Sequence, residues 1–97
     1  MPTYITLIKF TDKAVQSIKN SLKDGEEAIK RAEMLGAKVT NAYMTMGEYD
    51  GVTISECPND EAAVASTIAA SSDGNIRTTT LRAFTMEEFA EIVNKLP

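Results

Sequence analysis

The sequence predicts an α+β fold in which one antiparallel β-sheet carries its helices on a single face, with an extra helix at the C-terminus. Two observations lead to this fold class. The segments alternate in the order strand, helix, strand, strand, helix, strand, and a last helix follows. In addition, the first strand is apolar on both faces, which is typical of a central strand that is covered on both sides.

The first strand is predicted over Thr3–Phe10, which is rich in β-branched and aromatic residues. Under strict alternation Ile5 and Leu7 point to one face of the sheet, and Tyr4 and Ile8 point to the other. Because one layer of helices covers only one face, something else must cover the second. The sheet of another copy of the chain meets this need.

One helix, broken or kinked near Lys23–Gly25, is predicted to follow the first strand. Thr11 or Asp12 can cap its start, and Gly36 ends it. Asp24 with a glutamate three residues later fits a new capping box after the break. The basic residues assigned to its solvated face are Lys19, Lys23, Lys30 and Arg31.

The remaining segments are predicted as strands at 38–46, 50–57 and 76–84 and as helices at 61–72 and from residue 85. In the second strand, alternation places Val39, Asn41 and Tyr43 on one face. Gly47–Gly51 joins the second and third strands as a hairpin, because glycine supplies the positive φ values of tight turns. This order is the ferredoxin-like βαββαβ plan in a single domain over residues 1–97. Two such sheets packed face to face form a dimeric α/β barrel.

The charge distribution argues against a nucleic-acid partner. The net charge is −4, and the stretch from Val39 to Ile76 has six acidic residues and no Lys or Arg. Binding to a phosphate backbone needs a basic stripe, which this stretch does not provide. No segment approaches the ~18 consecutive apolar residues of a membrane span, so no membrane partner is expected.

Cysteine and histidine usage limits the chemistry further. Cys57 is the single cysteine, so it has no partner for an internal disulfide, and it is predicted to be a small buried residue. Without a signal-peptide pattern at the N-terminus, the cytoplasm is the expected location. The chain has no histidine, which excludes His-ligated haem and ordinary zinc sites. We expect neither a cofactor nor a metal.

Two motifs carry a resemblance to a known family. Gly-Glu-Tyr-Asp at 47–50 and Gly-Asn-Ile-Arg-Thr-Thr-Thr-Leu-Arg-Ala-Phe-Thr at 74–85 resemble the GYD domain family, and the opening Tyr-Ile-Thr-Leu-Ile-Lys-Phe-Thr-Asp-Lys fits its N-terminal pattern. The resemblance covers nearly the whole chain. It implies a ferredoxin-like, dimeric α/β-barrel fold and implies little about activity, because the family is essentially uncharacterised.

A second resemblance, from Gly47 to about Phe84, is to the effector-binding domain of Lrp/AsnC-type regulators. That module binds amino acids and related small molecules near subunit contacts. This chain has no helix-turn-helix segment before its first strand, so the resemblance implies ligand sensing and assembly without promoter binding.

Seven residues are candidates for a ligand site. Glu48, Tyr49 and Asp50 either shape the turn or line a ligand pocket or an oligomer contact at the sheet edge. The full set is Lys9, Tyr43, Glu48, Tyr49, Asp50, Arg77 and Arg82.

The two arginines are predicted to face opposite sides of the fourth strand, because five positions separate them. An ion pair within the chain or between subunits is favoured over a bound anion. Its acidic partners would be Glu48, Asp50 or Glu56. Tyr43, at mid-strand, is expected in the core.

Three classes of function remain open, and one of them is a purely structural oligomer with no ligand. The other two involve a small molecule. The first is a homo-oligomeric binding module that holds a small metabolite or acts through assembly, which the lack of a nucleophile–base pair favours. The second is a cofactor-independent oxygenase or isomerase that acts on an aromatic or enolisable metabolite, with Lys9, Tyr43, Glu48 and Arg82 as its polar groups. The sequence leaves enzymatic activity undecided and leans towards the binding module.

Overall fold

The fold is a single antiparallel sheet with the strand order β2-β3-β1-β4. The computed structural model describes residues 1–97. The strands are β1 (Thr3–Phe10), β2 (Lys38–Met44), β3 (Gly51–Glu56) and β4 (Ile76–Ala83). The helices are α1 (Asp12–Gln16), the 3-10 turn η1 (Ile18–Asn20), α2 (Ser21–Glu33), α3 (Asp60–Ala70) and α4 (Met86–Asn94). This order confirms the predicted βαββαβ class with its additional C-terminal helix.

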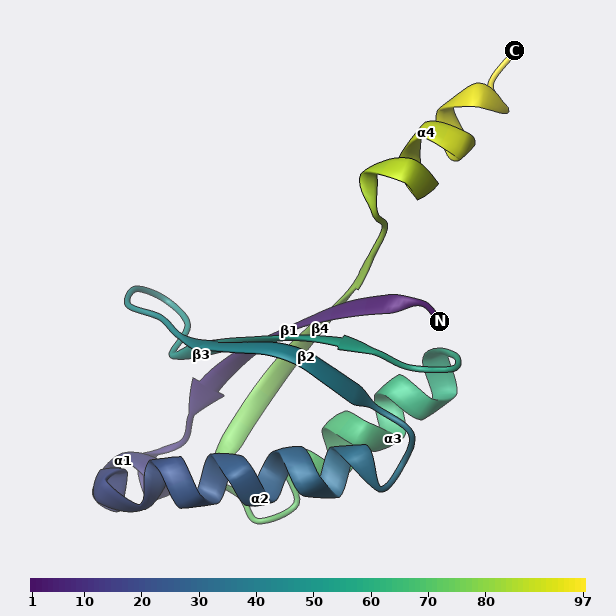
Figure 1. The fold of residues 1–97 in the computed structure, drawn as a ribbon. Helices are drawn as coiled ribbons and strands as arrows, with labels where there is room; N and C mark the ends of the chain where they lie inside the picture. The colour runs from purple at the N-terminus through teal and green to yellow at the C-terminus, as the bar shows by residue number, and fades with distance from the viewer.

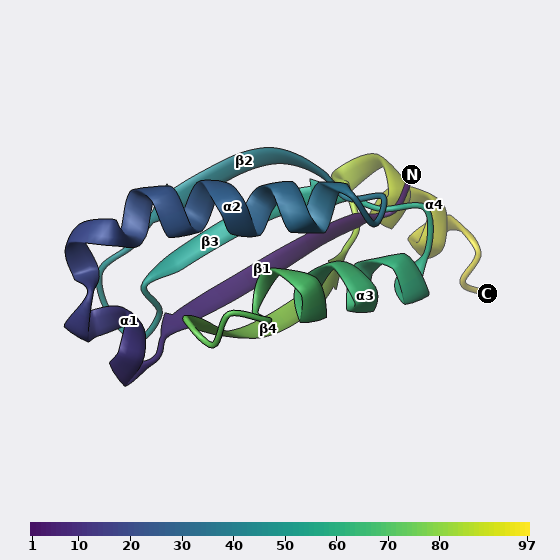
Figure 2. The same ribbon diagram turned by 90° about the horizontal axis from the view of Figure 1, so that it is seen from below.

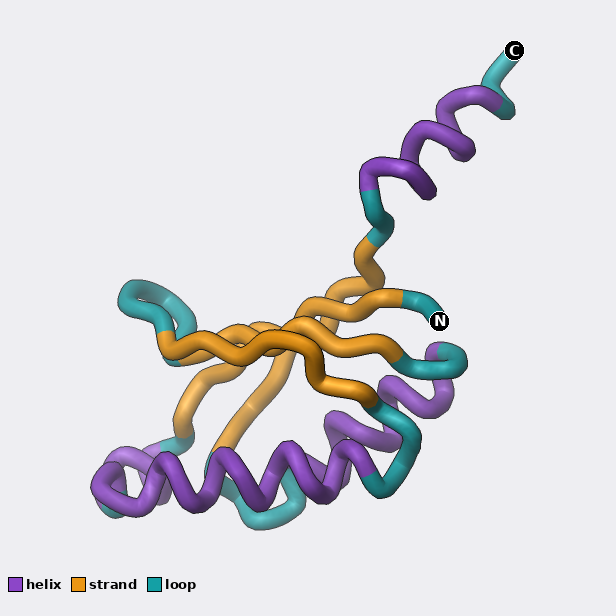
Figure 3. The backbone as a smooth tube through the Cα atoms, viewed as in Figure 1, coloured by secondary structure: helices purple, strands orange, loops and turns teal.

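The helices α2 and α3 lie side by side under one face of the sheet and leave the other face free (Figures 1 and 2). Figure 3 shows the same arrangement by element type, with α4 projecting away from the body of the chain on the side opposite α2 and α3. We call the uncovered surface the helix-free face. None of the helices combines the length and the apolar character that a bilayer span needs.

The strand register confirms that β1 is apolar on both sides. Ile5 is opposite Ile54 of β3 and Leu81 of β4, and Leu7 is opposite Val52. Because side chains alternate along a strand, these residues share the helix-free face. Tyr4, the residue before Ile5, is only 3% exposed and lies on the helix side.

Strand β2 differs from strict alternation. Its register shifts between Val39 and Asn41, so Val39 is opposite Ser55 while Asn41 is opposite Ile54. A bulge of this kind adds one residue to one strand, and it moves every side chain beyond it to the other face. The prediction that Val39 shares a face with Tyr43 is therefore wrong.

The break in the first helical segment lies earlier than predicted. Helix α1 starts at the Thr11 cap, whose hydroxyl accepts from the Ala14 amide at 3.3 Å, and it ends at Ser17. Helix α2 then runs through Gly25 without interruption. A glycine inside a helix costs only ~1 kcal/mol relative to alanine, so the flanking residues carry the helix across it. Gly36, at φ 100°, ends the segment as predicted.

The core is built mainly from small residues. Tyr4, Ala32, Ala37, Cys57 and Ala63 form its buried cluster. Small side chains let α2 and α3 approach closely, and the hydroxyl of Ser66 on α3 donates to the Ala32 carbonyl of α2 at 3.2 Å. Cys57 is 1% exposed, which confirms its predicted burial.

Arg31 is not on the solvated face of its helix, as the sequence had suggested. Its Nε donates to the Ala69 carbonyl at 2.8 Å, and its Nη2 donates to the Ala70 carbonyl at 2.9 Å and to Asp73 Oδ2 at 3.1 Å. A cation at this position binds the last carbonyls at the C-terminal end of α3. Helical periodicity did not predict this contact, because α3 is distant in the sequence.

Candidate functional site

Four of the predicted candidates meet at one end of the sheet. The β2–β3 turn brings Glu48 and Tyr49 beside Lys9, whose Nζ lies 4.0 Å from Glu48 Oε1 and 5.5 Å from the centroid of the Tyr49 ring. Arg77 is directly opposite Lys9 in the β1–β4 ladder. We call Lys9, Glu48, Tyr49 and Arg77 the rim cluster. Its ion pair is exposed, and such pairs contribute only about 0–1 kcal/mol.

Asp50 has a structural role at the same end. Its backbone amide donates to the Ile8 carbonyl at 2.8 Å, and its carboxylate accepts from the Phe10 amide at 2.8 Å. Both bonds tie the hairpin to β1. The next residue, Gly51, lies so close to β2 that an added Cβ would be 3.3 Å from the Tyr43 carbonyl oxygen. Asp50 and Gly51 therefore fix the turn on which the rim cluster depends.

The two arginines of β4 lie far apart and face opposite sides, as the spacing predicted. In the β1–β4 ladder Arg77 is opposite Lys9, whereas Arg82 is opposite Tyr4 and lies on the helix side. The Arg82 guanidinium stacks 4.5 Å from the centroid of the Phe84 ring. Within the chain neither arginine meets a carboxylate at salt-bridge distance, and each donates to a carbonyl of its own strand. An ion pair of either arginine within the chain is therefore ruled out, and an ion pair between subunits stays a prediction.

Tyr43 is on the helix-free face of the edge strand and is 58% exposed, so its predicted place in the core is wrong for a single chain. Its hydroxyl accepts from Asn41 Nδ2 at 3.3 Å. It is opposite Val52, and so it extends the apolar surface of that face towards the sheet edge.

Tyr4 and Asp60 form a polar contact that sequence reasoning missed. The Tyr4 hydroxyl donates to Asp60 Oδ1 at 2.5 Å, which joins β1 to the start of α3. This hydrogen bond, together with burial, raises the pKa of Tyr4 to about 12. The phenol thus keeps its proton at neutral pH and serves as a donor.

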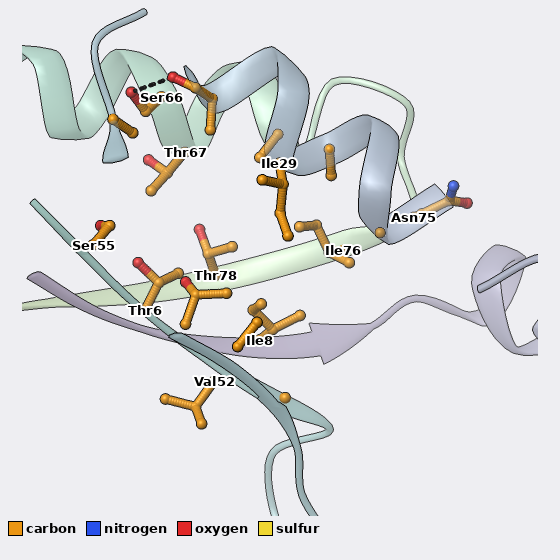
Figure 4. Close-up of a pocket in the computed structure, with 18 of the residues that line it drawn as sticks. Thr6, Ile8, Ile29, Val52, Ser55, Ser66, Thr67, Asn75, Ile76 and Thr78 are labelled. Atoms are coloured by element: carbon orange, nitrogen blue, oxygen red, sulfur yellow. Dashed lines mark hydrogen bonds between the residues drawn. The ribbon is translucent and has the colours of Figure 1, made fainter. Parts of the chain in front are cut away.

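A cleft of about 410 Å³ separates the sheet from α2 and α3. Figure 4 shows Ile8, Ile29 and Ile76 reaching into it from β1, α2 and β4. The cleft exists because the helices pack on each other through alanine and serine, and these short side chains leave the space above them unfilled. Volumes of ~300–1,000 Å³ are typical of small-molecule sites.

The polar lining of the cleft consists mainly of hydroxyl groups. Thr6 and Thr80 face each other across neighbouring strands, with their Oγ1 atoms 3.4 Å apart. The charged side chains that reach the cleft are the carboxylates Asp24, Glu26 and Asp73, and no Lys or Arg lines it. Such a lining suits a neutral, largely apolar molecule with one or two hydrogen-bonding groups, and it repels an anion.

Comparison with known proteins identifies the family. The family model of the GYD domain matches residues 4–93, which include both signature motifs. The chain belongs to the GYD domain family. The crystal structure of TTHA0845 from Thermus thermophilus has a similar fold, with 26% sequence identity and a TM-score of 0.59 over 88% of this chain and 95% of that one. No curated protein matches the chain.

The cleft of this GYD domain holds few of the residues that the sequence had singled out. Tyr43 is at its edge, while the rim cluster and Arg82 lie elsewhere. One signal could have pointed to it: Thr6 in β1 and Thr78 and Thr80 in β4 put hydroxyl groups on the face that an alanine-rich helix was expected to cover. Small residues opposite short polar ones indicate unfilled space.

Proposed function

We propose that this GYD domain is a homodimeric binding module that holds a small neutral molecule in the cleft between its sheet and its helices. The observation that carries the proposal is the cleft itself, with its three converging isoleucines and its hydroxyl lining. A packed domain of this size normally leaves few voids larger than a water molecule. A cleft of about 410 Å³ is therefore available for a ligand.

The charges around the cleft define the class of ligand. Asp24 and Glu26 place negative potential at its edge, while the charge of Asp73 is paired with Arg31. Bringing an anion there would add like-charge repulsion to the cost of removing its hydration. The proposed ligand is therefore an uncharged aromatic or aliphatic alcohol, ketone or amide, rather than a nucleotide or a carboxylic acid.

The helix-free face supports the dimer. Ile5, Leu7, Ile54 and Leu81 form a contiguous apolar surface that no element of the same chain covers. Full burial of one such side chain contributes about 1.5–3 kcal/mol. Packing of two sheets face to face would remove this surface from water and give the barrel-like dimer that the GYD resemblance implies. We also propose that the dimer is cytoplasmic, which its free, buried cysteine supports.

A thermal-shift titration tests the ligand proposal. The probe is 2-naphthol, a neutral aromatic alcohol, and its matched anion is naphthalene-2-sulfonate. We expect 2-naphthol to raise the melting temperature in proportion to the logarithm of its concentration above Kd, and we expect the sulfonate to have little effect. Equal stabilisation by both probes would contradict the charge argument.

A pair of matched variants locates the site. Ile29→Trp fills the cleft with a larger side chain, whereas Ile68→Trp adds the same group to an exposed position of α3 outside it. The response to 2-naphthol should disappear in Ile29→Trp and persist in Ile68→Trp. Loss of the response in both variants, or in neither, would contradict the assignment to the cleft.

A further inference from the structure

Helix α4 is amphipathic and has no packing partner in its own chain. It begins with a complete capping box between Thr85 and Glu88 and then extends away from the sheet. Its apolar residues Met86, Phe89, Ile92 and Val93 are all exposed. Isolated helices shorter than ~12–15 residues are marginal in water even with good caps. This helix of nine residues therefore needs a surface that covers its apolar side.

The direction of α4 indicates where that surface lies. The helix rises from the end of β4 on the helix-free side of the sheet, and the turn at residues 45–50 curls towards the same side at the opposite end (Figures 1 and 3). Two sheets that pair through this face about a two-fold axis across the strands would run in opposite directions. In that arrangement α4 of each copy lies beside the 45–50 turn of the other.

Charge favours this pairing over its alternative. A two-fold axis along the strands would instead place α4 against α4 and bring Glu87 and Glu91 close to their own copies. The end of the sheet with the turn carries two neighbouring cations, Lys9 and Arg77, with one carboxylate 4.0 Å from Lys9. Asp50 is also at this end, where its carboxylate accepts from the Phe10 amide, and Arg77 is the cation that has no carboxylate at salt-bridge distance in its own chain. The acids of α4 complement Arg77. In a two-fold interface each contact occurs twice, so α4 of each copy would contact the 45–50 turn of the other.

The turn also offers an apolar contact. Met46 is 97% exposed at its tip. A methionine sulfur packs favourably against an aromatic ring, and Phe89 is at the centre of the apolar side of α4.

We propose that α4 clasps a second copy of this chain, with Phe89 on Met46 of the 45–50 turn and its acids beside Lys9 and Arg77. The clasp rests on the pairing through the helix-free face proposed above. It gives the rim cluster a role in assembly, and it explains why an otherwise free helix carries an apolar stripe.

Site-directed cross-linking between two different variants tests the clasp. One full-length chain carries Met46→Cys and the other, with an affinity tag for identification by mass, carries Phe89→Cys. Because each chain has one added thiol, a link between them is necessarily between copies. With a short bis-maleimide we expect a linked heterodimer of positions 46 and 89. Replacing Phe89→Cys with Val64→Cys, on the exposed side of α3, should give no such link.

The alternatives give different products. A link from position 89 to Leu22→Cys at the cleft would overturn the clasp and place α4 in the cleft of the partner. A link between two copies of Phe89→Cys would overturn it in favour of the α4–α4 arrangement. No link in a chain that is dimeric by light scattering would also overturn it, while the pairing through the sheet would stand. A monomer at micromolar concentration would overturn both.

A second measurement does not depend on thiol chemistry. Phe89→Ala should raise the dimer Kd at least ~10-fold, since truncation of a central aromatic contact typically has this effect. Val64→Ala should leave it unchanged. The far-UV circular dichroism of both variants reports whether the fold is retained, and an unchanged dimer Kd in folded Phe89→Ala would contradict the clasp.

Discussion

Arg31 links the two helices under the sheet, and its removal gives a sharp test of how this layer is held. The variant Arg31→Ala deletes three hydrogen bonds, to the carbonyls of Ala69 and Ala70 and to Asp73, at 2.8–3.1 Å. The Arg31 side chain is only 29% exposed. In Arg31→Ala, water can therefore only partly replace the hydrogen bonds that the carbonyls of Ala69 and Ala70 and the Asp73 carboxylate lose.

The structure gives the magnitude of the loss. A hydrogen bond to a charged group contributes about 1.5–3 kcal/mol net. Three such bonds would sum to more, but the partners are partly exposed and regain some hydration. We therefore expect the free energy of unfolding to fall by about 3 kcal/mol. For a domain of this size, that corresponds to a melting temperature lower by roughly 10–20 °C.

Urea denaturation followed by circular dichroism measures this change, with the midpoint and slope fitted together. The control is Lys30→Ala, the preceding residue on α2, which is exposed and should change the free energy by no more than ~0.5 kcal/mol. Arg31→Lys should lie between the two, because lysine lacks the planar fork that binds several acceptors. If Arg31→Ala is as stable as Lys30→Ala, the proposed anchoring of α3 by α2 is refuted.

Three further changes have defined outcomes. Burial alone would raise the pKa of Asp73, but the hydrogen bond from the Asn75 amide and the Arg31 cation lower this pKa below its ordinary value. The Asp73 carboxylate therefore stabilises the fold above its ordinary pKa. This stabilisation is lost as the pH falls through the lowered pKa of the folded state. The stability difference between wild type and Asp73→Asn should thus shrink between about pH 5 and pH 2 in urea titrations, and a constant difference would argue against a charged contact. Leu7→Asp should raise the dimer Kd at least ~100-fold in sedimentation experiments, because an unpaired buried carboxylate costs several kcal/mol. An equal rise of the dimer Kd in the control Val64→Asp would count against the sheet interface. Asp50→Ala should lower the free energy of unfolding by about 1–3 kcal/mol, since it leaves the Phe10 amide without its acceptor, and a neutral effect would remove Asp50 from the hairpin anchor.

The sequence predicted the fold because its signals are local. Two-sided apolarity of β1, glycine at Gly36 and the Thr85 capping box each determine the structure within a few residues. The predictions that were wrong depended on contacts between distant segments. The bulge in β2 arises from pairing with β3, and the position of Arg31 depends on where α3 ends.

The candidate site was predictable only in part, for the same reason. The sequence singled out the members of the rim cluster as polar candidates, but it did not predict that Lys9 lies 4.0 Å from Glu48, since the two residues belong to distant segments. The cleft was not predicted, and the threonines of β1 and β4 are its one local signal. It results from the distance that close packing of α2 on α3 leaves below the sheet. The distance between the sheet and the helices depends on the sizes of residues from four separate elements, so no single sequence motif predicts it.

The isoleucine methyl groups allow one measurement of the central claim. The chain has eight isoleucines, of which Ile8, Ile29 and Ile76 line the cleft, while Ile5 and Ile54 lie on the helix-free face. In methyl-labelled protein, addition of 2-naphthol should shift the first three signals, and dilution through the dimer Kd should shift the other two. Shifts of Ile5 and Ile54 with the probe, with Ile8, Ile29 and Ile76 unchanged, would contradict a ligand site beneath the sheet and place binding on the proposed dimer face.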